Sequence, residues 1–246
     1  MTSCSPRTTL AALAAAGLLA ALPTASSGQS STAPTAVKSL SNESTLSRWA
    51  YPTRRSPVYA RASGKSRVVT RLRLLTENKL PELYLLRSQM TDSHGNQWVK
   101  IRVPKRPNGQ VGWVRRYSLG DFHVVRTQLV VNRHTLRVTL YKSGSPIFSA
   151  RVGVGRPSLP TPGGHFWVRE KFRVRGAPAY GPFAVGTAAY SSHLTDWPNG
   201  GVVGLHGTNE PGLIPGRPSH GCIRLHNSDI ARLYRILPLG TPLHII

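Results

Sequence analysis

HGTNEPGLIPGRPSHGCIRLHNSDIARLY, residues 206–234, carries a single cysteine, Cys222, in a loop rich in glycine and proline. The chain has one other cysteine, Cys4, in an N-terminal segment that we expect to be removed. A lone cysteine in an exported chain forms no internal disulfide. Cys222 is therefore an intermolecular link, an inert buried thiol or a reactive nucleophile.

The residues around Cys222 favour the nucleophile. A reactive cysteine needs a neighbour that accepts or stabilises its proton. His206 and His220 are the candidates, and the sequence leaves open which imidazole takes the proton. Gly221 allows backbone conformations closed to other residues, so nearby N–H groups can point at an oxyanion. Arg224 shares the face of Cys222 in an extended segment, where it can hold a substrate carboxylate.

A zinc site is not indicated by this pattern. Structural zinc takes about four ligands at short recurring spacings, such as two cysteines separated by two to four residues. One cysteine with two nearby histidines does not supply that spacing. We therefore expect neither a metal nor another cofactor.

Upstream of residue 206 the chain consists of short apolar or alternating runs separated by turn residues. The 23 glycines and 20 prolines are spread along its length, which favours many short strands over long helices. QWVKIRV, residues 97–103, alternates loosely, as a half-buried strand does. Further strands are predicted from residue 122 on, with polar turns at 132–134 and 142–145. The sequence thus predicts a mostly β protein.

One helix is predicted directly after the cysteine loop. Its apolar residues follow the i, i+3, i+4, i+7 spacing of one helix face: Ile230, Leu233, Tyr234 and Leu237. Asn227 or Ser228 is the expected cap, and Pro238 is the expected stop.

The start of the chain has the features of an export signal. Arg7 precedes an apolar run over residues 10–22 that small residues follow. The run is shorter than the roughly 20 residues of a membrane span. We expect a signal peptide at 1–25, with a membrane contact only if it stays uncleaved, and a flexible linker at 26–47, which is rich in Ser, Thr, Ala and Pro.

The chain is strongly basic, with 32 Lys and Arg against 9 Asp and Glu and a formal net charge of +23. Such a field attracts polyanions, and for an exported chain these are anionic wall polymers or membrane surfaces rather than nucleic acid. The arginines are scattered and do not form a block interleaved with aromatic residues. A solvated charged surface is therefore the simpler interpretation, and non-enzymatic binding to the wall is one candidate function.

Residues 206–234 resemble the signature of the YkuD-type L,D-transpeptidase catalytic family: His-Gly-Thr, a variable loop, then Ser-His-Gly-Cys followed one residue later by Arg or Asn. The resemblance extends upstream to about residue 124. It implies a β-sandwich catalytic domain over 122–246 with one or two short helices. Residues 48–121 are similar to the bacterial SH3-like barrel (Src-homology-3-like) of exported wall proteins, with a W-x-K-I strand followed by a G-W-V strand.

The resemblance implies a role for each residue of the motif. Cys222 would attack a carbonyl of a peptidoglycan stem peptide, form a thioester and release the terminal D-alanine. His206 would be the base, oriented through the carbonyl of Gly207, while His220 would shape the site. Backbone N–H groups of Gly221 and Cys222 would form the oxyanion hole.

Two further residues of the motif, Ser219 and Arg224, would hold the loop or the substrate. An acceptor amine would then resolve the thioester into a cross-link, whereas water would make the enzyme an L,D-carboxypeptidase. A wall-lysing cysteine peptidase is disfavoured, because those enzymes place the cysteine before the histidine. We expect a monomer in the cell wall or periplasmic space, with stem peptides as partners.

Overall fold

The structure, a computed structural model, describes residues 1, 36–195 and 198–246. The predicted signal peptide at 1–25 lies outside the described residues except for Met1, and so does the first part of the expected linker. No helix in the described part of the chain has the length and apolar character needed to cross a membrane.

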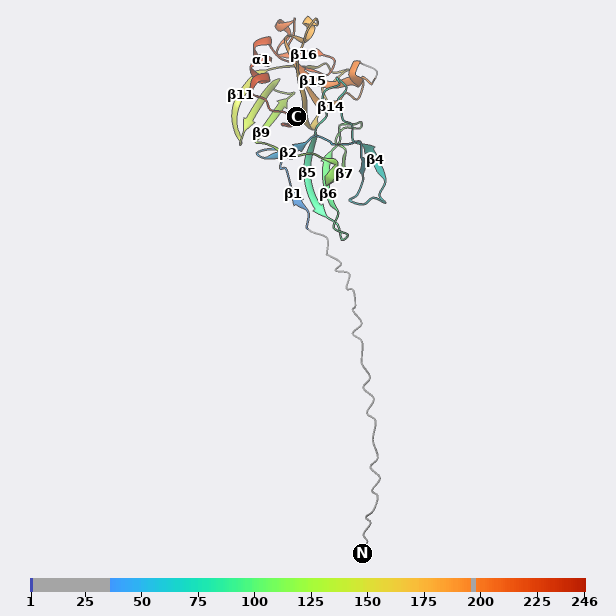
Figure 1. Cartoon of the computed structure of the whole chain (residues 1–246). Coiled ribbons are helices and arrows are strands. Elements are labelled where there is room, and N and C mark those ends of the chain that lie inside the picture. Colours follow the sequence, from blue (N-terminus) through green and yellow to red (C-terminus); the bar gives the residue numbers. More distant parts are fainter. Residues whose placement is uncertain (2–35, 196–197) are drawn as a thin grey trace. The chain divides into compact units, whose positions relative to one another are not determined.

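The described strands form two sheets (Figure 1). The N-terminal sheet has eight strands: β1 Lys38–Ser39, β2 Ser47–Ala50, β3 Pro57–Tyr59, β4 Val68–Arg71, β5 Tyr84–Thr91, β6 Gln97–Arg102, β7 Val111–Arg115 and β8 His123–Val125. They run in the order β4-β3-β7-β6-β5-β2-β8, with β1 added on β5. A 3-10 turn, η1 at Arg116–Ser118, precedes β8.

The second sheet has ten strands in the order β11-β10-β9-β18-β13-β14-β15-β17-β12-β16. Their bounds are β9 Thr127–Asn132, β10 Arg137–Lys142, β11 Ser145–Arg151, β12 Gly153–Gly155, β13 Gly164–Arg173, β14 Phe183–Tyr190, β15 Val202–His206, β16 Gly216–Ser219, β17 Ile223–Arg224 and β18 Pro242–Ile245. The connections include η2 Pro178–Tyr180, η3 Pro198–Gly201, η4 Pro211–Leu213 and the helix α1 Asn227–Ile236. The predicted mostly β fold is confirmed.

The sequence pattern explains the first hairpin of this sheet. Buried and half-buried residues alternate along β9, so that Leu129 and Val131 enter the core. The side chain of Asn132 then accepts hydrogen bonds from the N–H groups of His134 and Thr135, both at 2.9 Å. An asparagine that bonds its own downstream backbone favours a turn, and β10 follows in antiparallel register.

The helix forms where the apolar spacing predicts it, but its cap differs from the expectation. His226 occupies the cap position without a side-chain bond to the helix. Asn227 is the first helical residue, and its Oδ1 accepts the Thr208 N–H at 2.9 Å. This side chain therefore ties the helix to the turn after β15, a contact 19 residues away that local sequence does not reveal.

Part of the expected linker is folded, which corrects the prediction for residues 36–47. Lys38–Ser39 pairs with β5, and Leu40 is buried in the core of the N-terminal sheet. The side chain of Asn42 accepts N–H groups of the next turn, including that of Thr45 at 2.9 Å. The polar composition suggested a flexible segment, but one apolar anchor and one asparagine turn are sufficient to order it.

The N-terminal sheet packs directly on the core of the second sheet. Trp49 belongs to the larger apolar cluster, and a Cβ on Gly240 would lie 1.9 Å from its ring. Trp167 donates from its indole to the carbonyl of Leu83 at 3.2 Å. The described residues from 36 on form one compact unit. The division at residue 121 and the SH3-like resemblance stay predictions.

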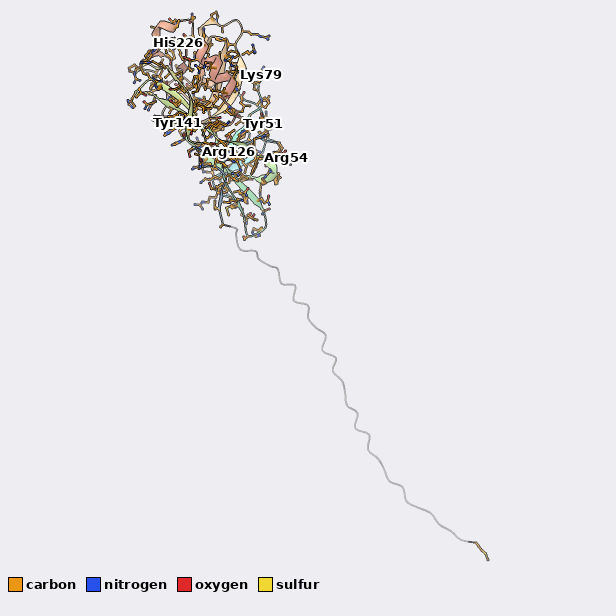
Figure 2. The ribbon with its side chains drawn as sticks, turned by 90° about the vertical axis from the view of Figure 1, so that its left-hand side faces the viewer. Tyr51, Arg54, Lys79, Arg126, Tyr141 and His226 are labelled. Carbon is orange, nitrogen blue, oxygen red and sulfur yellow. The ribbon has the colours of Figure 1, made fainter. Side chains whose placement is uncertain are left out.

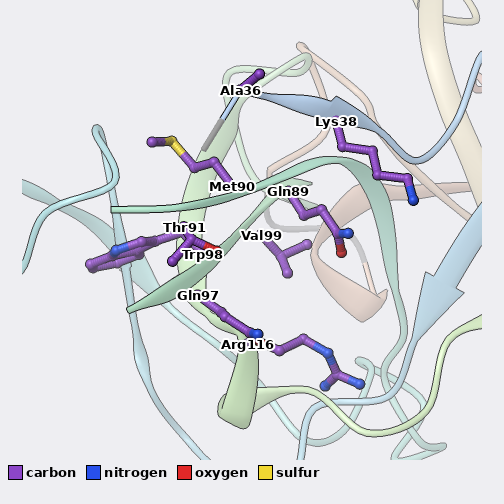
Figure 3. Close-up of a pocket in the computed structure, with 9 residues that line it drawn as sticks. All are labelled: Ala36, Lys38, Gln89, Met90, Thr91, Gln97, Trp98, Val99 and Arg116. Atoms are coloured by element: carbon purple, nitrogen blue, oxygen red, sulfur yellow. The ribbon is translucent and has the colours of Figure 1, made fainter. Parts of the chain in front are cut away.

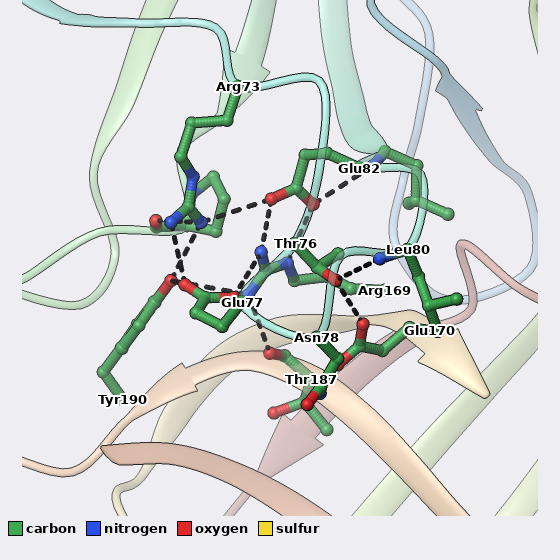
Figure 4. A network of polar contacts seen from close by, with 12 residues as sticks. Arg73, Thr76, Glu77, Asn78, Leu80, Glu82, Arg169, Glu170, Thr187 and Tyr190 are labelled. Atoms are coloured by element: carbon green, nitrogen blue, oxygen red, sulfur yellow. Dashed lines mark hydrogen bonds and ion pairs between the residues drawn. The ribbon is translucent and has the colours of Figure 1, made fainter. Parts of the chain in front are cut away.

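A loop of the N-terminal half, residues 72–82, extends onto β13 and β14 of the second sheet (Figure 4). In Figure 2, Lys79 of this loop lies well above Tyr51 and Arg54, toward the end of the molecule that carries His226. Glu82 is fully buried, and its carboxylate pairs with the guanidinium of Arg169. This contact matters for the site, because β13 and β14 form one of its walls.

Candidate active site

The pairing of β15 with β17 brings the predicted nucleophile beside the predicted base. The two strands are parallel, with Leu205 opposite Ile223 and His206 opposite Arg224. Leu205 and Ile223 are fully buried in the core. Because side chains alternate along a strand, His206, Cys222 and Arg224 share the other face. His206 and Cys222 both line a cavity of about 220 Å³ there.

The imidazole of His206 is held in one tautomer. Its Nδ1 lies 2.6 Å from the carbonyl oxygen of Gly207, which can only accept a hydrogen bond. Nδ1 therefore carries the proton, and Nε2 is left with its lone pair. The pKa of His206 is lowered to about 4: burial lowers it most, the bond to Gly207 opposes this change, and the charge of Arg224 adds to it. At neutral pH the ring is uncharged and can act as a base.

The thiol of Cys222 is free and partly buried. Burial raises its pKa, while a hydrogen bond with the backbone of Gly204 and the charge of Arg224 act in the opposite direction. The resting site therefore holds a neutral thiol beside a neutral imidazole. Such a pair reacts by transferring the proton as the sulfur attacks, and not from a preformed ion pair.

Two glycines fix the carbonyl that orients His206. A Cβ on Gly207 would lie 2.2 Å from Asn227 Oδ1 and 2.9 Å from the Cα of Gly181. A Cβ on Gly181, which has a φ of +63°, would lie 2.6 Å from the Cα of Gly207. The two backbones thus approach more closely than any side chain permits. Gly207, predicted as the orienting residue, offers its carbonyl oxygen to His206 Nδ1 at 2.6 Å.

The loop that carries Cys222 is closed by its own polar groups. Ser219 Oγ donates to the carbonyl of Cys222 at 2.5 Å and accepts the N–H of Gly221 at 3.1 Å. Gly221 has a φ of +123°, which a side chain rarely adopts. Thr161 Oγ1 donates to the carbonyl of Gly221 at 2.8 Å. The N–H of Gly221, expected in the oxyanion hole, is therefore engaged with Ser219.

Arg224 already has a carboxylate partner at the edge of the site. Its Nη1 lies 2.8 Å from Glu210 Oε2, and Glu210 is half exposed. Its Nε is buried without a hydrogen-bond partner among the described residues. His220 lines the same cavity as Cys222 and is exposed, in contrast to His206. The structure thus brings every predicted site residue to one end of β15 and β17.

A second cavity of about 300 Å³ is also lined by His206 and Cys222. Both cavities are lined by His206, Cys222 and Tyr180, whose ring centroid lies 4.6 Å from that of His206. The second cavity extends along β13 and β14 to Glu170 and Asn78. The thiol is therefore reached from two spaces, which suits a reaction with two substrates.

A third cavity, of about 150 Å³, lies on the N-terminal sheet (Figure 3). Its lining includes Lys38, Gln89, Trp98 and Arg116, and neither member of the reactive pair. No group of three or more His, Cys, Asp and Glu side chains arranged to hold a metal ion occurs among the described residues.

Comparison with known proteins identifies the family. The model of the L,D-transpeptidase catalytic domain (YkuD) matches residues 126–245. A Bacillus subtilis protein named as an L,D-transpeptidase, YkuD, is 30% identical over 124 residues, which cover 50% of this chain and 68% of that protein. The chain belongs to the YkuD family of L,D-transpeptidases. The predicted family and enzyme class are confirmed.

Other L,D-transpeptidases align over 45% to 90% of their own length. ErfK/SrfK of Salmonella typhimurium, named as a probable L,D-transpeptidase, is 30% identical over 140 residues, which cover 50% of this chain and 45% of that protein. Among solved structures, an Enterococcus faecium L,D-transpeptidase aligns with a TM-score of 0.39 and 23% identity over 49% of both chains. One from Mycobacterium smegmatis aligns with a TM-score of 0.40 and 16% identity, covering 61% of this chain and 90% of that one.

Several residues of this L,D-transpeptidase site were not predicted from the sequence. Thr161 anchors the cysteine loop, Gly181 supports Gly207, and the ring of Tyr180 packs against that of His206 at a tilt of 49°. Asn227, one of the two residues predicted as the helix cap, instead binds the turn after His206. Their signal lies in contacts between distant segments, so no spacing within the motif could have revealed them.

Proposed function

We propose that the protein is an exported peptidoglycan L,D-transpeptidase with Cys222 as its nucleophile. The main support is that His206, at the end of β15, and Cys222, directly before the adjacent β17, line the same cavities, with His206 Nε2 left free by the bond of Nδ1 to Gly207. The acyl donor is a stem tetrapeptide that ends in D-alanine. Family membership supports the reaction class.

In the first half-reaction, Cys222 Sγ attacks the carbonyl carbon before the terminal D-alanine while His206 Nε2 takes the thiol proton. The tetrahedral intermediate collapses as the carbon–nitrogen bond to D-alanine breaks. His206 returns the proton to the leaving amine, so D-alanine departs and a thioester remains on Cys222. The imidazole is neutral again and ready for the second step.

In the second half-reaction, the amine of an acceptor stem attacks the thioester carbonyl. His206 takes a proton from that amine, the carbon–sulfur bond breaks, and the thiolate takes the proton back. The product is an amide cross-link, and Cys222 is restored as a thiol. With water as the nucleophile, the same sequence gives L,D-carboxypeptidase activity.

The oxyanion of both intermediates needs N–H donors near Cys222. Because the N–H of Gly221 is bonded to Ser219 Oγ, we assign this role to the backbone N–H of Cys222. Arg224 would bind the carboxylate of the terminal D-alanine, in exchange for its exposed partner Glu210. Charge-assisted pairs of this kind are directional, which suits the alignment of a donor.

The signal-like residues 1–25 support the proposed export, and the net charge of +23 favours contact with anionic wall polymers. We propose that the protein acts as a monomer at the wall. The charge also favours the second candidate, a non-enzymatic wall-binding protein. That function predicts salt-sensitive binding that Cys222→Ala leaves intact.

The deciding experiment is intact-mass spectrometry of the purified protein with a disaccharide tetrapeptide. We expect a covalent acyl adduct on Cys222, released D-alanine and a dimeric product. Cys222→Ala should give none of these but still bind wall sacculi. A carbapenem, which resembles the acyl donor of this family, should label the same thiol. If wild type binds sacculi but forms no adduct with either compound, the wall-binding function replaces the enzyme.

Gly207→Ala tests the support of the base. The added Cβ overlaps Asn227 Oδ1 and the backbone of Gly181, so the carbonyl that holds His206 must move. We expect acylation of Cys222 to slow at least tenfold, and the free energy of unfolding to fall by about 1–3 kcal/mol. Gly212→Ala, in the same loop and with nothing within 4 Å of its Cβ, is the matched control. Equal rates for the two variants would contradict the role of the Gly207 carbonyl.

A further inference from the structure

Glu170 of β13 presents a buried carboxylate to the larger of the two cavities beside Cys222. Glu170 is 4% exposed and lines the cavity of about 300 Å³ together with Cys222. Both oxygens accept hydrogen bonds from the loop of the N-terminal half: Oε2 from Thr76 Oγ1 and Oε1 from Asn78 Nδ2, both at 2.5 Å (Figure 4). Each contact donates to the carboxylate, as the ionised form requires.

This carboxylate has no cationic partner among the described residues, although the chain holds 32 basic residues. The two neighbours along β13 are engaged elsewhere. Arg169 pairs with Glu77 and Glu82, and Lys171 donates to the carbonyl of Leu237 at 2.7 Å. Buried charges in proteins are normally paired, so a carboxylate left without a cation beside a reactive thiol is suited to a cationic ligand.

The sheet register sets the path from this carboxylate to the thiol. Glu170 lies opposite Gly186 of β14, and Gly186 lies opposite Gly204 of β15. Gly204 in turn lies beside Cys222, since its backbone bonds to the thiol. The two residues between acid and thiol in this line of the sheet are thus glycines, which have no side chain to place between them. A Cβ on Gly186 would lie 2.4 Å from Glu170 Oε1, so the carboxylate itself lies over this glycine.

The length of this path selects the ligand. Neighbouring strands are about 4.8 Å apart, so the carboxylate over Gly186 is roughly 10 Å from Cys222. An extended side chain with four or five carbon–carbon bonds spans roughly 6 Å, and its terminal ammonium adds about 3 Å of hydrogen-bond distance. A diamino acid acylated through its carboxyl on Cys222 therefore reaches Glu170 with its side-chain amine. The amine of an acceptor must contact the thioester itself, so it lies too near the thiol to bind Glu170.

We infer that Glu170 binds the side-chain ammonium of the diamino acid whose carbonyl acylates Cys222, and so selects the donor. This inference rests on the proposed function. It also gives the N-terminal half a part in the site, because Thr76 and Asn78 hold the carboxylate in place. The experiment distinguishes this ammonium from any other that could bind Glu170, above all the amine of the acceptor stem.

The experiment compares two tetrapeptide donors that differ only at the third residue: a diamino acid, and norleucine, which lacks the amine. Acylation of Cys222 is followed by intact mass in the absence of acceptor. Wild type should acylate about 10–100-fold faster with the amine-bearing donor, as expected for one hydrogen bond to a charged group. In Glu170→Gln, which keeps the size of the side chain, the ratio of the two rates should fall toward one.

Asp121→Asn, which removes an exposed acid and the same charge, is the matched control and should keep the wild-type ratio. Three results would overturn the inference: no discrimination in wild type, an equal loss with both donors in Glu170→Gln, or a loss that appears only when the acceptor is added. The last would place the acceptor amine at Glu170. Failure of either donor and of a carbapenem to label Cys222 would instead reject the proposed function itself, and the inference with it.

Discussion

Replacing His206 with glutamine should slow acylation of Cys222 by about 10²–10⁴-fold, the usual contribution of a positioned general base. The thiol has a raised pKa and is protonated at neutral pH, so it needs a proton acceptor during attack. His206 is the buried imidazole whose Nε2 is left unprotonated by the bond to Gly207. The rate is measured as the appearance of the acyl adduct by intact mass.

His220→Gln provides the comparison that assigns the base. His220 is exposed at the rim of the cavity, so its loss should slow acylation far less than the loss of His206.

The pH profile of the acylation rate gives a second readout. Because the pKa of His206 is lowered to about 4, the wild-type rate should fall as pH drops through about 4 and not near 6.5. A larger loss of rate in His220→Gln than in His206→Gln would assign the proton to His220 instead.

The candidate site residues could be grouped from the sequence because the motif begins at the end of β15 and leads into β17, which is adjacent to it. His206 and Cys222 are 16 residues apart, and β15 and β17 pair directly, so local pattern and tertiary contact coincide. The helix was predicted for the same reason, since its apolar spacing is local. By contrast, Thr161 contacts the cysteine loop across 60 residues and Thr76 contacts Glu170 across 94. Such partners depend on the sheet order, which apolar alternation does not specify.

The direction of backbone groups was also beyond the sequence. Gly221 was expected to offer its N–H to an oxyanion, since a glycine beside the nucleophile permits that geometry. In the structure this N–H bonds to Ser219 Oγ. The residue types were thus correct for the loop, whereas the orientation of one peptide group depends on which nearby acceptor it meets. The polar composition of residues 36–47 likewise predicted a flexible segment, whereas in the structure Leu40 is buried in the core of the N-terminal sheet.

Arg169 holds the two halves of the protein together, and Arg169→Met should lower the free energy of unfolding by about 3 kcal/mol. Its guanidinium is almost fully buried and bonds to the carboxylates of Glu82 and Glu77 (Figure 4). Glu82 is fully buried, so the variant leaves this charge with Arg73 alone, at 3.2 Å. Removing one member of a buried ion pair lowers the free energy of unfolding by more than the intact pair adds to it, because the remaining charge stays buried without its partner.

Arg73→Met is the matched control, because its side chain joins the same carboxylates but is 41% exposed. We expect a loss of about 1 kcal/mol or less there. Urea unfolding of both variants and of wild type gives the comparison, and equal losses would contradict a special role for Arg169.

The pH dependence of stability should also differ between wild type and Arg169→Met. The pKa of Glu77 is lowered to about 2, because Arg169, the Tyr190 hydroxyl and Arg73 outweigh its burial. Its stabilising contribution is therefore present above pH 4.5 and lost as pH falls toward 2, and this loss should shrink in Arg169→Met.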